Sequence, residues 1–88
     1  RSRGYDLAKT ASRVAEVVGV KEKDVWAKGR YRQVVEARGL LCYWAVRELG
    51  VTMASLAGRL GISIPAVGKS VSRGERLARE KGYSLLVS

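Results

Sequence analysis

Basic and small polar side chains recur at helical spacing in SIPAVGKSVSR, residues 63–73. Apolar Ile64, Val67 and Val71 share one side of a helix drawn through this segment, and the other side carries no carboxylate. Ammonium, guanidinium and hydroxyl groups donate hydrogen bonds to phosphates and base edges, and small residues let a helix enter a DNA major groove. We therefore predict a DNA-contacting surface made of the following residues: Ser63, Ala66, Lys69, Ser70 and Arg73.

A helix, a tight turn and a second helix are predicted to position these residues, over 52–73. Thr52 is a good N-cap, because its hydroxyl can accept a hydrogen bond from a free N–H of the first turn. Gly61 follows where a helix ends in a left-handed residue, and Ser63 caps the next helix with Pro65 in its first turn. The pattern is typical of a DNA-binding helix-turn-helix. An ordinary helical hairpin with a solvated basic face is the alternative.

A second cationic stretch lies upstream, in AKGRYR, residues 27–32. Lys28, Arg30 and Arg32 fall there beside an aromatic residue and a glycine, and Arg38 follows in the next predicted helix. One interpretation is that these cations are simply solvated at the surface and bind no ligand. Because narrow minor grooves attract arginine, we instead expect these four cations to hold the DNA backbone or the minor groove.

The remaining pattern is helical throughout. Helices are predicted over 7–18, 22–27 and 33–49, with Asp6 as the cap of the first and Gly19, Gly29 and Gly50 after them. The helix over 33–49 is apolar around most of its circumference, which is typical of a buried central helix. We expect an all-α fold, a small bundle of about five helices that contains the helix-turn-helix. The whole chain, 1–88, is predicted to be a single DNA-binding domain.

Three residues within these elements leave alternatives open. Gly39 inside the central helix would let another helix, or a phosphate backbone, come close. Beyond Arg73 the helical pattern either continues through Gly74 with a kink or begins again as a separate helix, and Gly82 ends it. Trp26 is predicted to be a core residue rather than an exposed platform for stacking a base.

Composition favours a polyanionic partner. The 88 residues carry 17 basic and 8 acidic side chains, a formal charge of +9. Neutralising phosphates releases counterions, so such an excess suits nucleic acid. No apolar run approaches the ~20 residues of a membrane span, so a membrane partner is not expected.

Enzyme chemistry is not indicated. The chain has no histidine and one cysteine, Cys42, which falls on an apolar helix and is predicted to be plain core. No nucleophile–base pair, carboxylate pair or phosphate-cradling loop occurs at useful spacing. We expect no catalytic residue, metal site or cofactor. The chain begins with Arg1, which suggests a fragment of a longer protein.

The order of elements resembles the C-terminal DNA-binding domain of the bacterial replication initiator DnaA. The likeness is clearest in VAEVVGVKEKDV (14–25), EARGLLCYWAVRELG (36–50) and VTMASLAGRLG (51–61). It implies that the second helix of the motif enters the major groove, that Arg30 enters the minor groove and that Arg38 contacts the backbone. The initiator has Gly-Gly-Arg-Asp-His-Thr-Thr-Val where this chain has GISIPAV, so its origin-box specificity does not carry over.

The segments ARGLLCYWAVRELG (37–50) and SVSRGERLAREKGYSL (70–85) resemble a second group of proteins more closely still. These are domains at the C-terminus of bacterial single-tyrosine transposases associated with repetitive extragenic palindromes. That resemblance implies a DNA-recognition domain active in DNA recombination, in the cytoplasm and on the nucleoid. Cutting would belong to an upstream domain of the same parent chain, which uses two metal-binding histidines and a tyrosine.

Two other functions stay open at this point. The same fold could dock on a protein through Trp26, Leu77 and the apolar tail over 83–88. It could also be the DNA-binding domain of a replication initiator or of a transcription regulator. The target sequence, the oligomeric state and the length of the parent protein do not follow from the sequence.

Overall fold

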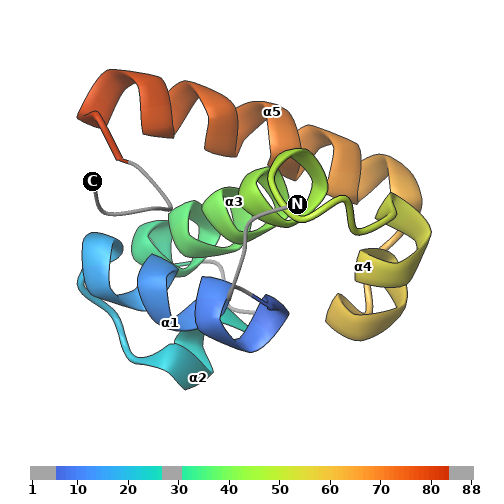
Figure 1. Cartoon of the computed structure of the whole chain (residues 1–88), viewed down its shortest axis with the longest axis horizontal. Coiled ribbons are helices and arrows are strands. Elements are labelled where there is room, and N and C mark those ends of the chain that lie inside the picture. The colour runs from blue at the N-terminus through green and yellow to red at the C-terminus, as the bar shows by residue number, and fades with distance from the viewer. Residues whose placement is uncertain (1–5, 27–30, 84–88) are drawn as a thin grey trace.

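The computed structural model describes residues 6–26 and 31–83, and all structural statements below concern those ranges. They contain five helices and no strand (Figure 1). The helices are α1 (Leu7–Val18), α2 (Glu22–Val25), α3 (Arg32–Arg47), α4 (Met53–Leu60) and α5 (Ile64–Lys81). The predicted all-α bundle of about five helices is therefore confirmed. None of these helices is long and apolar enough to cross a membrane.

The residues predicted to begin and end α1, α4 and α5 do so, whereas α2 ends at Val25, two residues before its predicted end at 27. The side chains of Asp6 and Thr52 accept hydrogen bonds from backbone N–H groups in the first turns of α1 and α4. Such N-caps contribute about 1 kcal/mol each. Gly19, Gly61 and Gly82 end α1, α4 and α5 in the left-handed region, at φ 86°, 69° and 71°. A side chain there would be strained, so these glycines place the turns.

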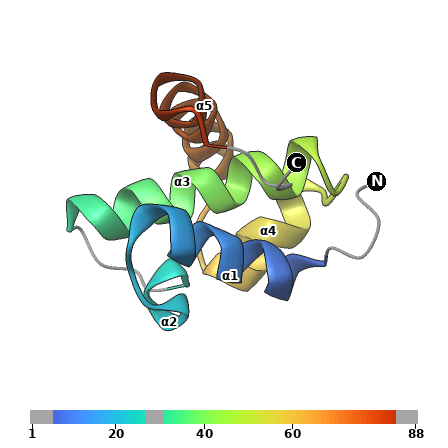
Figure 2. The same cartoon turned by 60° about the vertical axis from the view of Figure 1, so that its left-hand side comes forward.

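Helix α3 is the centre of the molecule. It lies between α1 and α5 in both views of the fold (Figures 1 and 2). Its expected span of 33–49 was too long at the C-terminal end, because α3 ends at Arg47. The N–H groups of Glu48 and Leu49 both turn back to the carbonyl of Trp44, at 2.8 and 3.2 Å. Gly50, at φ 73°, then leads the chain toward α4.

The core is formed by the apolar faces of all five helices around α3. Leu40, Leu41 and Cys42 of α3 are fully buried, together with Val14 of α1 and Leu56 of α4. The prediction of Cys42 as plain core is thus confirmed. Burial raises the pKa of its thiol to about 11, although Arg38 and a hydrogen bond with Ser70 act in the opposite direction. A neutral thiol in an apolar site is chemically inert near pH 7.

Two glycines set the crossing of α3 and α5. Figure 2 shows α5 nearly end-on where it passes across α3. A Cβ atom added to Gly39 would lie 3.2 Å from the carbonyl oxygen of Ser70. A Cβ added to Gly74 would overlap the Gly39 carbonyl and lie 2.8 Å from the Cβ of Tyr43. Gly39 therefore admits a second helix, one of its two predicted uses.

The same contact decides how the chain continues past Arg73. Helix α5 runs without interruption from Ile64 to Lys81, so a separate second helix after Gly74 is wrong. Gly74 is buried in the middle of α5, where a glycine costs about 1 kcal/mol of helix stability. The close approach of the two backbones explains why a residue without a side chain stands there.

Candidate nucleic-acid interface

The unit formed by α4, the turn and α5 lies where it was predicted. The N–H groups of Gly61 and Ile62 bond to the carbonyl of Ala57, at 2.9 and 3.1 Å. The hydroxyl oxygen of Ser63 accepts a hydrogen bond from the N–H of Ala66 at 3.2 Å, which starts α5. Val67 of α5 is fully buried in the core, so the first turns of α5 are held by packing as well as by the cap.

The outward face of α5 is cationic. Val67, Val71 and Gly74 face the core. The predicted residues Lys69 and Arg73 are exposed. Arg76, which was not among the predicted residues, is exposed as well. It lies one turn beyond Arg73, and a helix predicted to continue through Gly74 would have included it.

Ala66 and Ser70 are placed differently from Lys69 and Arg73. Both are half-buried. The Ser70 hydroxyl forms a hydrogen bond with the Cys42 thiol of α3, and its backbone lies over Gly39. The four residues share a side of α5 in the sequence pattern, but α3 covers part of that side. Ala66 and Ser70 therefore lie at the margin of the exposed face.

Ser63 is exposed at the start of α5. Its oxygen accepts the hydrogen bond that caps the helix, and its own hydroxyl hydrogen remains a donor. The residue can therefore serve both the fold and a ligand. Sequence reasoning assigned it both roles.

A groove of about 400 Å³ joins the first turn of α3 to the C-terminal half of α5. Its walls carry the guanidinium-bearing residues Arg32, Arg73 and Arg76. The other lining residues are Val35, Glu36, Leu77 and Glu80. The structure therefore brings Arg32, predicted from the upstream cationic stretch, to the same groove as Arg73, predicted from the helix-turn-helix.

Acidic side chains neutralise this surface only in part. Arg32 pairs with Glu36, with 3.3 Å between Nε and Oε2, but the arginine side chain is 88% exposed and such a pair is weak. Within the described ranges, Lys69, Arg73 and Arg76 form no ion pair with a carboxylate. These three exposed cations of α5 therefore remain available to an anion.

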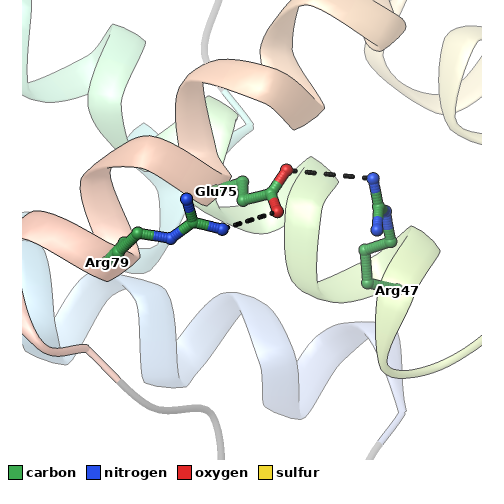
Figure 3. A network of polar contacts seen from close by, with 3 residues as sticks. All are labelled: Arg47, Glu75 and Arg79. Atoms are coloured by element: carbon green, nitrogen blue, oxygen red, sulfur yellow. Dashed lines mark hydrogen bonds and ion pairs between the residues drawn. The ribbon is translucent and has the colours of Figure 1, made fainter.

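Glu75 is held away from these cations. Its two carboxylate oxygens pair with Arg47 of α3 at 3.8 Å and with Arg79 of α5 at 3.2 Å (Figure 3). The carboxylate lies between the two guanidinium groups, one from the end of α3 and one from the next turn of α5. The network therefore carries a net positive charge itself, from two guanidinium groups and one carboxylate.

Of the remaining predicted cations, the structure describes Arg38 but not Lys28 or Arg30. Arg38 is half-buried on α3, and its charge acts on the pKa of Cys42, but it does not line the Arg32–Arg73 groove. Lys28 and Arg30 lie outside the described residues. A second groove, of about 470 Å³, is lined among the described residues by Asp6 and by uncharged side chains.

Trp26 follows α2 and is half-buried against the core. The guanidinium of Arg59 from α4 stacks over its ring, 5.2 Å from the centroid. This cation–π contact ties α2 to α4 and agrees with a core residue rather than a free stacking platform.

Comparisons with known proteins add no relative to this description. No protein-family model matches the chain, and no curated protein and no solved structure matches it either. The function is therefore inferred from the sequence pattern and the geometry of the surface.

Proposed function

We propose that this chain binds duplex DNA in a sequence-specific manner, with α5 in the major groove. The observation that carries the proposal is the convergence of Arg32 from α3 with Arg73 and Arg76 from α5 on one groove. Lys69 continues the same exposed side of α5. In this arrangement α5 presents donors to base edges, while Arg32 holds the phosphate backbone beside it.

The charge balance supports a nucleic-acid partner. The chain carries a formal charge of +9, and among the described residues Lys69, Arg73 and Arg76 on the exposed face of α5 form no ion pair with a carboxylate. Each phosphate neutralised by such a side chain releases condensed counterions, so affinity should fall steeply with salt. A small helical unit with a short turn between α4 and α5 is a geometry that enters the major groove.

The resemblance to the C-terminal domains of single-tyrosine transposases gives the proposal a setting. In that setting the chain recognises DNA on the bacterial nucleoid for an upstream catalytic domain of the same parent protein. The replication initiator and the transcription regulator differ from this proposal in the parent protein and not in the activity of the domain.

The protein-docking alternative loses two of its three anchors. Leu77 is only 8% exposed, and Trp26 is half-buried under Arg59. The third anchor, the tail, lies beyond the described residues except for Tyr83, which packs on the core. A hydrophobic docking surface built on these residues is therefore not favoured.

Selection of bound duplexes from a random pool tests the proposal directly. We expect a convergent motif. Lys69→Ala and Arg73→Ala should change the preferred bases, since good contacts to base edges discriminate by about 1–3 kcal/mol. Lys9→Ala removes the same charge from an exposed position on α1 and should leave the motif unchanged. A pool that stays random after selection would refute sequence-specific binding.

A further inference from the structure

Ile64 is an apolar side chain that the core does not take up. Its sequence position groups it with Val67 and Val71, and these two are buried as expected. Ile64 is instead 50% exposed, one of two large hydrophobic side chains exposed in the described ranges. Sharing a side of α5 with these two residues therefore does not bury it. Ile64 is the first residue of α5, and half of its surface lies outside the core.

The surface of α5 next to Ile64 carries no large side chain. Gly68 follows it by one helical turn, and a Cβ atom added there would meet only the Met53 sulfur, at 4.0 Å. Ser72 follows by a second turn and is exposed. Ile64, Gly68 and Ser72 thus follow one another along one line of the α5 surface, where the side chains after Ile64 are short and uncharged. Lys69 lies directly beside this line.

We propose that Ile64 recognises a thymine through its 5-methyl group. The inference rests on the proposed function, because it assumes that α5 lies in the major groove. The N-terminal residues of a recognition helix contact base edges, and Ile64 is the first of them in α5. Thymine alone presents a methyl group in the major groove, whereas the other bases present donors or acceptors that an isoleucine cannot satisfy.

The chemistry of the surroundings favours a base over a protein. A stable protein interface takes about 800 Å² from each partner, and a single half-exposed isoleucine supplies a small part of that. The exposed residues that follow it on α5 include Lys69, Arg73 and Arg76. An exposed apolar side chain at the start of a helix that also carries exposed cations suits a DNA groove, where a thymine methyl group is flanked by phosphates.

Uracil substitution isolates the contact, because it removes only the 5-methyl group. Each thymine of the selected duplex is replaced in turn by uracil, and the dissociation constant is measured by fluorescence anisotropy. We expect a loss of about threefold to fivefold at one position, the effect of one buried methyl group. Ile64→Ala should bind the thymine duplex more weakly and show no uracil effect at that position. Ile64→Val should keep most of it.

Lys69→Ala is the matched control, since it should weaken binding and still distinguish thymine from uracil. The inference is overturned if the selected duplex has no thymine, if no uracil position affects the wild type, or if Ile64→Ala keeps the full uracil effect. It is also overturned if Ile64→Ala changes self-association in sedimentation but leaves DNA affinity unchanged. In all these cases duplex binding stands. Failure to select any duplex refutes the proposed function instead.

Discussion

Arg32 and Arg79 form the same kind of ion pair at different places on the surface. Arg32 pairs with Glu36 at 3.3 Å and Arg79 with Glu75 at 3.2 Å, each across one helical turn. Both arginine side chains are highly exposed, so either pair contributes about 0.3–0.5 kcal/mol. They differ in that Arg32 lines the groove with Arg73, which makes Arg79 a control for the loss of charge.

We expect Arg32→Ala to weaken binding to all duplexes, whatever their sequence. It should lower the slope of log affinity against log salt by about 1, because one phosphate contact is lost. Arg79→Ala should change both quantities less. Titrations at several salt concentrations measure the slopes. Equal slopes for the two variants would show that Arg32 does not contact a phosphate.

Cys42 predicts a stability change at alkaline pH. Burial raises the pKa of its thiol from 9.0 to about 11 in the folded protein, so the folded state holds this proton more tightly than the unfolded chain does. The stabilisation is fully present below pH 9 and is lost as the pH rises toward 11. Between these values the free energy of unfolding should fall by up to about 1.4 kcal/mol per pH unit.

Urea unfolding of the wild type and of Cys42→Ala measures this effect. The other ionisable groups are common to both proteins and cancel in the comparison. The variant is less stable at pH 8 because it leaves a cavity, and the difference between the two proteins should shrink as the pH approaches 11. A difference that stays constant over this range would contradict the raised pKa.

At the scale of elements, the pair α3 and α5 determines where the cations lie. The groove that joins Arg32 to Arg73 exists because the backbones approach closely at Gly39 and Gly74. The same approach turns Ser70 toward Cys42 and leaves Lys69 outside. A change at the crossing would therefore alter the distance between the groups proposed to contact DNA, as well as the stability.

Gly74→Ala should destabilise the protein by about 1–3 kcal/mol, since its methyl group would overlap the Gly39 carbonyl. Gly39→Ala should cost less, because the nearest atom would be 3.2 Å away. Gly58→Ala is the control: it lies within α4 with nothing near its added Cβ, and should gain up to about 1 kcal/mol.

Urea midpoints measured by circular dichroism compare the three variants. Stabilisation of Gly74→Ala to the level of Gly58→Ala would refute the close crossing. Where Gly39→Ala folds, its selected DNA motif should stay the same while its affinity falls, because α5 is displaced relative to Arg32 and its own side chains are unchanged.

For the whole molecule, local signals predicted the elements well. Capping residues and glycines such as Asp6, Thr52 and Gly61 act through groups a few residues away, so the sequence alone locates the ends of the helices that carry them. Helices α2 and α3 end earlier than predicted. The apolar circumference of α3 likewise predicted its central place. The extent of α5 was less certain, because Gly74 signals a break to local reasoning and its packing partner lies 35 residues away, at Gly39.

The composition of the exposed face depends on contacts that local patterns do not contain. Ile64 was grouped with Val67, and Ser70 with Lys69, by helical spacing. Ile64 lies at the margin of the core and is half exposed, whereas α3 covers part of Ser70. Both outcomes follow from the packing of α5 on α3 and α4, so no helical pattern within 63–73 could have separated these residues.

Salt dependence belongs to the whole molecule as well. With a formal charge of +9, non-specific association with duplex DNA should be strong at 50 mM salt and weak at 200 mM. Specific affinity should decline less in relative terms, because base contacts do not release counterions. Competition with random-sequence duplex at both concentrations measures the ratio of specific to non-specific affinity. A ratio near one at 200 mM would mean that binding is electrostatic attraction without sequence preference.

The paired glycines also provide a way to recognise distant relatives of this chain. A helix pair with backbones this close cannot accept a side chain at position 74 unless the axes separate, so substitution there is constrained by geometry more than by chemistry. If α5 binds DNA as proposed, surface positions such as 69 and 73 are free to diverge as the preferred site changes. A search for homologues should therefore weight the glycines at 39 and 74, with their spacing, above the residues proposed to face DNA.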